Sequence, residues 1–344
     1  TRAEPRVRLM LVGAKRGIEA RILPDSGYEY RLLPIEPLYR ARPWRNWRML
    51  ASSPVVMAGL QRAFADLEPT LVAGTGGYAS APAVAWAVAR KRPTALLEQN
   101  AMPGMVTRLF APHVDQVHLG YPEARDRLRF GRYTRVLDSG NPVATAPVRN
   151  GFDWPSGRVV AVVGGSQGAR GLNERLLDGL GRSGDLPSDT TVVWVAGPTN
   201  QDEVAARAAA SAWADRIRVV PFIPDLGAQM DGLTLAICRA GAMTCAELAV
   251  AGVPAILVPL PTAAGDHQTF NARALETVGA AVLRRENDVG GGEVWRLVLE
   301  LLADDTRRKR MADSMAARGR PDAADTIAAE LLGLARSGRK VIDE

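Results

Sequence analysis

The chain has 344 residues, and at about 150 residues per domain this length predicts two domains. Hydrophobic residues make up 47% of the chain and charged residues 23%, and this composition excludes a disordered protein. The chain contains no apolar run of about 18 residues and does not start with a signal-type segment, which favours a cytosolic protein. The net charge of +6 indicates an anionic partner, for which nucleic acid, nucleotide phosphates and acidic lipid headgroups all qualify.

Short β-rich runs alternate with helical patterns along the whole chain. Apolar residues at three- and four-residue spacing between the runs indicate helices, and this alternation predicts parallel sheets covered on both faces. Strands are predicted in the first half at 7–12, 28–33, 70–73, 94–97, 114–118 and 135–137. Strands are predicted in the second half at 159–163, 191–195, 217–220, 235–238, 255–258 and 280–283.

The strand pattern restarts after Gly140-Asn141-Pro142-Val143, and the polar segment 145–157 has the composition of a domain linker. We therefore expect an N-terminal domain over 1–143 and a C-terminal domain over 144–321, with the helices of about 322–344 packing back on the first domain. Because ligands bind beyond the carboxyl ends of strands in such sheets, the site is expected between the two domains.

The turn Gly164-Gly165-Ser166-Gln167-Gly168 has the composition of an anion-binding loop. Its glycines let the backbone approach a ligand closely, and the helix that follows presents unpaired N–H groups. The turn matches neither a P-loop nor a Gly-x-Gly-x-x-Gly fingerprint. The residues alone therefore leave phosphate binding and a plain tight turn equally open.

A second turn, CRAGAMTCAEL at 238–248, repeats this design. Gly241 permits a sharp turn before the N–H groups of 242–244, and Glu247 follows one turn further along. That carboxylate suits a ribose diol, although support of the first helical turn through the helix dipole is an equal alternative. Cys238 and Cys245 lack the spacing of a zinc site and are predicted to be reduced packing residues.

Polar side chains also follow other strands. After the strand at 255–258, Gln268 suits recognition of sugar hydroxyls, whereas His267 is more typical of a surface histidine than of a catalyst. In the first half, the pair Gly76-Gly77 suits either a phosphate or a plain turn. No DxD-like pair of carboxylates lies at a strand end, so no dedicated metal site is predicted, and no other cofactor is predicted either.

Seven short motifs occur in an order typical of one known family. They are GTGGYASAP (74–82), EQNAMPG (98–104), GNPV (140–143), GGSQGAR (164–170), PFIPDL (221–226), CRAGAMTCAEL (238–248) and DHQTFNA (266–272). Together they resemble the MurG family of bacterial N-acetylglucosaminyltransferases. No single motif is decisive, but seven in order are highly specific, and the resemblance runs from about Val7 to the C-terminal helices.

The resemblance implies an α/β fold of the GT-B type, with two doubly wound Rossmann-like domains facing a central cleft. It implies an inverting hexosyltransferase that moves N-acetylglucosamine (GlcNAc) from UDP-GlcNAc to the C4 hydroxyl of N-acetylmuramic acid (MurNAc) in undecaprenyl-diphosphate-MurNAc-pentapeptide. This step converts lipid I into lipid II in peptidoglycan synthesis, and so contributes to cell wall biogenesis, cell shape and cell division. The implied location is the cytoplasmic face of the cell inner membrane.

Carried over residue by residue, the resemblance also implies a donor site. Ser166 would hold the diphosphate, the backbone of Ile223 would read the uracil edge, and Glu247 would take the ribose diol. Gln268 would bind GlcNAc hydroxyls, and Asn100 would approach that sugar from the other domain. The α-phosphate and ribose would contact a turn formed by Ala242, Met243, Thr244, Cys245 and Ala246. The general base is not assigned.

The chain departs from the family pattern in two places. A MurG-like chain opens with a strand, a GGTGGH-type loop and a helix. The first such unit of this chain, at 7–24 (VRLMLVGAKRGIEARILP), resembles the second unit of the family. One unit of about 20 to 30 residues is therefore expected to be missing. The His of that loop is a candidate base, and a base is worth roughly 10² to 10⁴ in rate, so slow turnover is expected. At Ala144 many members carry an arginine that contacts the donor.

The segment from Tyr39 to Arg48 interleaves aromatic residues with arginines, and an apolar helix is expected after it. Aromatic side chains settle at headgroup depth, and each arginine gains about 1 kcal/mol near an anionic leaflet. Because the implied acceptor is a lipid, this segment is predicted to bind an anionic membrane surface peripherally. Two tryptophans packed under a solvated basic loop are the alternative. No nucleic-acid-binding signature accompanies the segment.

Two other functions stay open at this point. A UDP-GlcNAc 2-epimerase shares the fold and the donor, but it needs acidic and basic side chains around the sugar, and the available carboxylates and histidines do not cluster that way. A catalytically impaired protein that binds UDP-GlcNAc would bind the donor without transferring the sugar.

Overall fold

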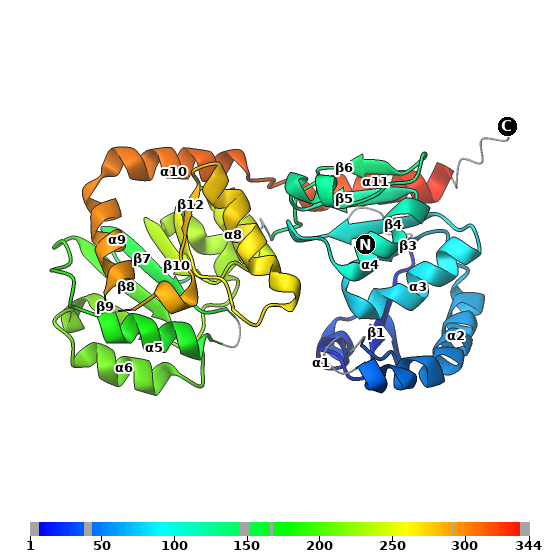
Figure 1. Ribbon diagram of the computed structural model, residues 1–344, viewed down its shortest axis with the longest axis horizontal. Coiled ribbons are helices and arrows are strands. Elements are labelled where there is room, and N and C mark those ends of the chain that lie inside the picture. The colour runs from blue at the N-terminus through cyan, green and yellow to red at the C-terminus, as the bar shows by residue number, and fades with distance from the viewer. Residues whose placement is uncertain (1–6, 38–42, 145–150, 166–167, 291, 338–344) are drawn as a thin grey trace. The chain divides into compact units, whose positions relative to one another are not determined.

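The computed structural model describes residues 7–37, 43–144, 151–165, 168–290 and 292–337 (Figure 1). These residues form two compact units. Unit 1 comprises the described residues of Thr1–Gln99, Pro103–Ser139 and Ala324–Glu344. Unit 2 comprises those of Asn100–Met102 and Gly140–Ala323. Among the described helices, none is both long and apolar enough to cross a bilayer.

Unit 2 is built on a parallel six-stranded sheet in the order β12-β11-β10-β7-β8-β9. Its central strands are buried on both faces, as a parallel sheet covered by helices requires. The order reverses between β7 and β10, whose register pairs Val163 with Cys238, so the carboxyl ends of these two strands form the topological switch point. The strands are β7 (Arg158–Val163), β8 (Thr190–Val195), β9 (Ile217–Val220), β10 (Leu235–Cys238), β11 (Ala255–Leu257) and β12 (Ala281–Leu283).

Helices cover both faces of this sheet because right-handed crossovers change face where the strand order reverses. On one face of the sheet, alternate residues of β7, β8 and β10 pack against α5, α6 and α9 to form the core. Trp295 lies at the centre of this core, and its ring centroid is 5.2 Å from that of Trp213 and 6.0 Å from that of Trp194. The helices are α5 (Arg170–Gly179), α6 (Gln201–Ala209), α7 (Ala242–Ala251), α8 (His267–Thr277), α9 (Glu293–Ala303) and α10 (Asp305–Ala317).

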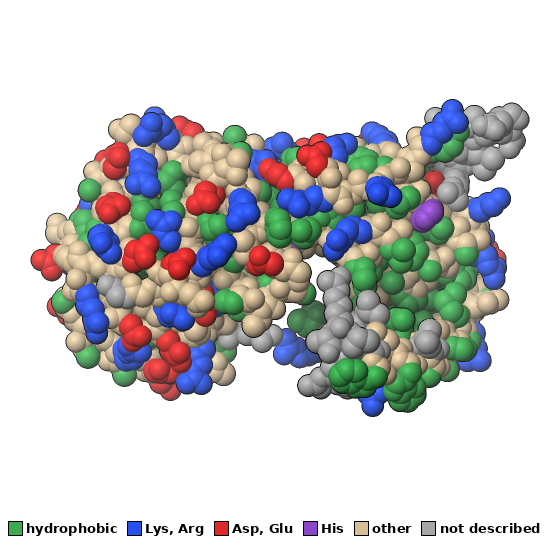
Figure 2. Space-filling view, viewed as in Figure 1, with side chains coloured by type: hydrophobic (Ala, Val, Ile, Leu, Met, Phe, Trp, Pro, Cys, Tyr) green, Lys and Arg blue, Asp and Glu red, His purple; other side chains and the backbone are tan. Residues whose placement is uncertain are grey.

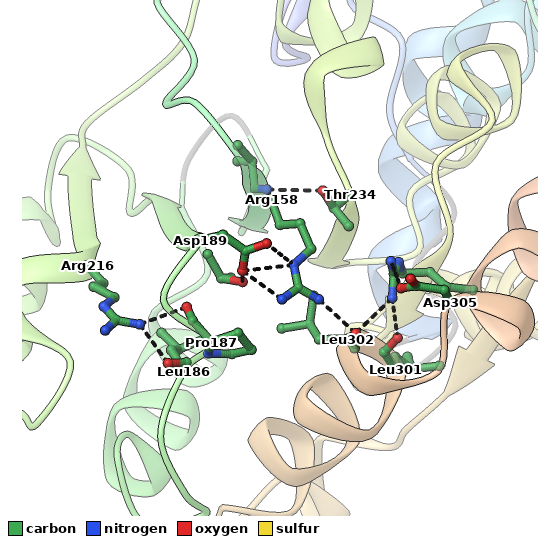
Figure 3. A network of polar contacts seen from close by, with 12 residues as sticks. Arg158, Leu186, Pro187, Asp189, Arg216, Thr234, Leu301, Leu302 and Asp305 are labelled. Atoms are coloured by element: carbon green, nitrogen blue, oxygen red, sulfur yellow. Dashed lines mark hydrogen bonds and ion pairs between the residues drawn. The ribbon is translucent and has the colours of Figure 1, made fainter.

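The amino-terminal end of β7 is held by an arginine network, drawn in Figure 3. Arg158 Nη2 lies 2.6 Å from Asp189 Oδ1, and Arg158 Nη1 donates to the carbonyl of Leu302 at 2.8 Å. These contacts join β7 to the start of β8 and the end of α9. They lie at the opposite end of the sheet from the switch point.

Unit 1 contains two parallel sheets, a β1-β2 pair and a four-stranded sheet in the order β3-β4-β5-β6. The strands are β1 (Met10–Ala14), β2 (Glu29–Leu33), β3 (Val72–Gly74), β4 (Thr94–Glu98), β5 (Gln116–Leu119) and β6 (Arg135–Leu137). The helices are α1 (Glu19–Ile22), α2 (Trp47–Leu67), α3 (Gly77–Ala89), α4 (Met105–Phe110) and α11 (Ala323–Ser337). α11 is joined to β6 by Arg135, whose Nη1 lies 2.5 Å from Glu330 Oε2.

All twelve strands predicted from the sequence occur, and the α/β class with two Rossmann-like units is confirmed. The largest boundary shift is at β1, which begins at Met10 rather than Val7. The strands of unit 1 fall into two sheets because the β1-β2 pair does not join β3 among the described residues. Hydrophobic alternation reports where strands lie, not which edges pair, so the sequence could not predict this division.

His118 in β5 is a buried imidazole with two polar partners. Its Nδ1 lies 2.8 Å from Ser139 Oγ and its Nε2 lies 3.2 Å from Gln116 Oε1. Burial lowers the pKa of His118, Glu330 opposes this shift and Arg135 adds to it. In the unfolded chain the imidazole titrates near a pKa of about 6.5. The folded state therefore binds fewer protons than the unfolded state in the window below that value.

We expect the chain to lose stability as the pH falls from about 6.5 through the lowered pKa of His118, because only the unfolded state gains the proton there. His118→Gln should remove that part of the loss. The measurement is the difference in melting temperature between pH 7.5 and pH 5.5, with exposed His113→Gln as the matched control. An equal pH response in wild type and His118→Gln would contradict the prediction.

Candidate functional site

Two glycines of the turn after β7, Gly164 and Gly168, leave no room for a Cβ atom. Gly168 has a φ of +72°, and a Cβ there would lie 2.6 Å from the carbonyl oxygen of Ala196 and 2.7 Å from Asn200 Nδ2. Its N–H donates to the carbonyl of Gly165 at 2.9 Å. The turn is thus pressed against the end of β8, and α5 begins two residues later. Ser166, the predicted diphosphate ligand, lies outside the described residues, as does Gln167.

The turn after β10 presents the start of α7. Gly241 is the N-cap with extended backbone, and the first helical hydrogen bond runs from Cys245 N to the Gly241 carbonyl at 2.9 Å. The N–H groups of 242–244 therefore have no partner within the helix and lie at the positive end of its dipole. Because β7 and β10 are neighbours, the described residues of the turn after β7 (Gly164, Gly165 and Gly168) and the turn Arg239–Gly241, together called the paired turns below, lie at the same switch point.

Glu247 lies on α7, one turn beyond these N–H groups. A Cβ on Gly227, in η6 (Leu226–Gly232), would lie 2.4 Å from Glu247 Cδ, so the carboxyl group packs directly on the Gly227 backbone. Burial raises the pKa of Glu247. The sequence predicted this carboxylate as a diol ligand, but it gave no sign that Gly227 must be a glycine for the carboxyl group to fit.

The loop before η6 holds the predicted uracil-reading residue. Ile223 is 1% exposed, so its side chain anchors the loop while neighbouring Phe222 is 54% exposed. Gln229 Nε2 donates to the carbonyl of Pro224 at 2.7 Å and holds the loop from the other side. A rigid backbone edge beside an exposed ring suits a planar base. Ile223 was predicted from the sequence as a ligand residue, whereas Phe222 was not.

The predicted sugar ligand Gln268 lies in the first turn of α8. Its Oε1 accepts from the N–H of Leu260 at 2.9 Å, which leaves the donor Nε2 for a ligand. His267 Nδ1 lies 2.6 Å from the carbonyl of Ala264, a bond that ties the ring to its own loop. This contact gives no support to a catalytic role for His267.

Asn100 is oriented by a residue that the sequence did not single out. Asn271 on α8 is fully buried, and its Nδ2 donates to Asn100 Oδ1 at 3.1 Å and to the carbonyl of Ala240 at 3.2 Å. Its Oδ1 accepts from the N–H of Ala101 at 2.8 Å. The structure thus brings Asn100 next to the turn after β10. An asparagine among the apolar positions of α8 is the sequence signal that could have identified Asn271.

The predicted turn Ala242–Ala246 divides by exposure. Met243 is 38% exposed, whereas Cys245 is 1% exposed and its N–H is used by the helix, so Cys245 offers packing rather than a ligand group. Neither Cys238 nor Cys245 is in a disulfide, both are buried, and burial raises the pKa of Cys238 well above its usual value. In the described part of the chain, no group of three His, Cys, Asp or Glu side chains could hold a metal ion.

Two helix N-termini, a carboxyl group and a rigid backbone edge thus share the carboxyl end of one sheet. Unpaired N–H groups attract phosphate, and a carboxylate accepts from vicinal hydroxyls. The arrangement suits a nucleoside diphosphate. Negative charge at this end of the sheet would be stabilised by the unpaired N–H groups at the start of α5 and α7.

Comparison with known proteins identifies the family of the chain. Residues 159–327 match the glycosyltransferase family 28 C-terminal domain, and residues 1–119 match the N-terminal domain of that family. A curated UDP-N-acetylglucosamine–N-acetylmuramyl-(pentapeptide) pyrophosphoryl-undecaprenol N-acetylglucosamine transferase of Salinibacter ruber is 37% identical, over 96% of this chain and 90% of that protein.

Solved structures agree with this match. The crystal structure of Acinetobacter baumannii MurG is similar with a TM-score of 0.72 and 28% identity, over 93% of this chain and 89% of that one. A UDP-N-acetylglucosamine 2-epimerase superposes with a TM-score of 0.65 at 13% identity, over 100% of this chain and 92% of that one, which shows a shared fold alone. The chain belongs to the MurG family of N-acetylglucosaminyltransferases, within glycosyltransferase family 28.

Proposed function

We infer that the chain is an N-acetylglucosaminyltransferase that transfers GlcNAc from UDP-GlcNAc to lipid-linked MurNAc-pentapeptide, the step that forms lipid II in peptidoglycan synthesis. The observation that carries this inference is the placement of two helix N-termini at the switch point of unit 2, with Glu247 one turn along α7. Family membership supplies the identity of the sugar and of the acceptor.

We propose that unit 2 binds the donor. The paired turns hold the diphosphate, the Ile223 backbone reads the uracil edge, and Glu247 accepts from the ribose diol. Gln268 Nε2 donates to a hydroxyl of GlcNAc, since its Oε1 is already engaged by Leu260. Asn100, fixed by Asn271, approaches the sugar from the side of the turn after β10.

The same arrangement supports inverting transfer. The C4 hydroxyl of MurNAc attacks C1 of GlcNAc from the face opposite the diphosphate, and the C1–O bond to UDP breaks as the new glycosidic bond forms. Negative charge grows on the leaving β-phosphate, where the helix N-termini of the paired turns stabilise it. We assign no residue as the base that removes the hydroxyl proton.

The experiment that tests the function is transfer of labelled GlcNAc from UDP-GlcNAc to a lipid I analogue by the 344-residue chain. Labelled lipid product together with free UDP, both dependent on the acceptor, would support the proposal. Formation of UDP-N-acetylmannosamine would instead identify an epimerase, and UDP-GlcNAc binding without either product would identify a binding protein. Both of these results would overturn the proposed reaction.

We also propose that unit 1 holds the acceptor side and binds the cytoplasmic face of the cell membrane peripherally. Trp44 is 71% exposed, Trp47 is 62% exposed and Val55 is 61% exposed, around η2 (Pro43–Asn46) and the start of α2. Apolar side chains are visible along this edge of unit 1 in Figure 2. Arg48 lies 5.9 Å from the Trp47 ring centroid, which places a cation beside the apolar surface. The rest of the predicted segment, from Tyr39 to Arg42, lies outside the described residues.

We expect Trp44→Ser/Trp47→Ser to weaken binding to vesicles with anionic phospholipid by about tenfold or more, because two exposed indoles lose their place at headgroup depth. Co-sedimentation with such vesicles measures the effect. The matched control is Tyr133→Ser, since Tyr133 is 61% exposed and also has an arginine 5.3 Å from its ring centroid. Equal loss in the control, or no loss in the double variant, would contradict this surface.

A further inference from the structure

Arg239 is a buried cation within one of the paired turns, and it has no role in the site described so far. It directly follows β10, and its side chain is 9% exposed. Its Nη1 donates to the carbonyls of Val258 at 3.3 Å and Pro259 at 3.2 Å, just beyond β11. Its Nη2 lies 2.5 Å from Glu286 Oε2. One side chain thus joins the ends of β10 and β11 to η8 (Glu286–Asp288), which follows β12.

Glu286 extends this connection to the other turn. Its side chain is 15% exposed, and a Cβ on Gly171 would lie 2.7 Å from Glu286 Oε1. The carboxylate therefore packs against Gly171 in the first turn of α5, the helix that follows the turn Gly164–Gly168. Glu286 consequently packs on Gly171, three residues beyond one of the paired turns, and its partner Arg239 lies within the other.

The pair is constrained by its burial. Burying a charge costs free energy unless it is paired with an opposite charge, so if either side chain moved away the other would be a buried, unpaired charge. Among the described residues, Arg239 Nε and Glu286 Oε2 have no hydrogen-bond partner, so the 2.5 Å contact is an ion pair without hydrogen-bond alignment. The guanidinium fork reaches carbonyls and carboxylate at once, which a lysine ammonium cannot do with the same geometry.

We propose that Arg239 is a positioning residue that sets the separation of the paired turns, and thereby their fit to the diphosphate of the donor. This inference rests on the proposed donor site in unit 2. The diphosphate contacts both turns, whereas uridine contacts the Ile223 loop and Glu247, neither of which touches Arg239 in the hydrogen bonds and ion pair described above. Loss of Arg239 therefore weakens UDP binding and leaves uridine binding nearly unchanged.

The experiment compares the affinities of UDP and uridine by titration calorimetry for wild type, Arg239→Met, Arg239→Lys and Glu286→Gln. Arg239→Met should lower the UDP affinity by about tenfold or more, since small displacements of binding groups carry costs of this size, with uridine affinity within about twofold of wild type. Arg239→Lys and Glu286→Gln should fall between Arg239→Met and wild type. If Arg239→Met fails to fold, the affinities of Arg239→Lys and Glu286→Gln for UDP and uridine test the proposal instead.

The matched control is Arg158→Met. Arg158 has the same kinds of partner, the carboxylate of Asp189 and the Leu302 carbonyl, but its side chain is more exposed, at 27%, and it lies at the opposite end of the sheet (Figure 3). The Arg158→Met substitution should lower the melting temperature and leave the ratio of UDP affinity to uridine affinity unchanged. An unchanged ratio in Arg239→Met and in both milder variants would overturn the proposal, as would equal weakening of both ligands. Failure of wild type to bind UDP would instead overturn the donor site itself.

Discussion

Gly168→Ala is expected to lower kcat/KM for GlcNAc transfer by about a hundredfold or more. The alanine would have to adopt a φ of +72° with its Cβ 2.6 Å from the Ala196 carbonyl oxygen, so the turn must move away from the end of β8. Strain of this kind costs of order 1 to 3 kcal/mol before any displacement of the N–H groups that we propose to bind phosphate is counted. Because every 1.36 kcal/mol is tenfold in rate, strain and displacement together reach the expected loss. Steady-state kinetics with varied UDP-GlcNAc measures it.

The control for this substitution is Gly279→Ala. Gly279 has a φ of +76°, close to that of Gly168, but its Cβ would meet only Ser314 Oγ, at 3.9 Å. It lies between α8 and β12, at the amino-terminal end of that strand and thus away from the switch point. Gly279→Ala should cost about 1 kcal/mol of stability and leave kcat/KM within about twofold of wild type. Equal losses of kcat/KM in the two variants would mean that strain, not displacement of the turn, is responsible.

The sequence predicted the strands and turns that form the proposed donor site because each depends on local chemistry. Buried strands are apolar runs, and glycines such as Gly168 and Gly241 mark turns where the backbone must bend sharply. Glu247 was placed correctly on α7 because it is one helical turn from Gly241. Local pattern therefore fixed which residues stand at the carboxyl ends of the strands.

Contacts between distant segments could not be predicted in this way. The packing of Glu247 on Gly227 and the Arg239–Glu286 pair each join elements that are separated by strands and helices. Hydrophobic periodicity reports burial along one element and carries no information on which partner a buried polar group meets. Asn271 shows the same limit, since its position in α8 signals a buried polar group but does not identify Asn100 or Ala240 as its partners.

Glu247→Gln is expected to raise the KM for UDP-GlcNAc by about ten- to a hundredfold, since hydrogen bonds to a charged acceptor contribute roughly 1.5 to 3 kcal/mol. kcat should change less, because the ribose is remote from the reacting carbon. A pH series adds a second readout. In wild type, donor affinity should fall as the pH drops through the raised pKa of Glu247, whereas the variant should show no such dependence. Glu174→Gln, which changes an exposed carboxylate one turn along α5, is the matched control.

The stability of the free protein distinguishes this role from the alternative that Glu247 supports the first turn of α7 through the helix dipole. Because burial raises the pKa of Glu247, the folded state binds more protons than the unfolded state just above the usual glutamate pKa, and stability falls as the pH rises through that window. At neutral pH the buried charge thus opposes folding, and Glu247→Gln should raise the melting temperature while it weakens donor binding. A carboxylate that served the helix dipole would give the opposite sign, with a lower melting temperature and an unchanged KM. Opposite changes in stability and donor affinity in one variant would mean that the protein tolerates a buried carboxylate at this position for the ribose.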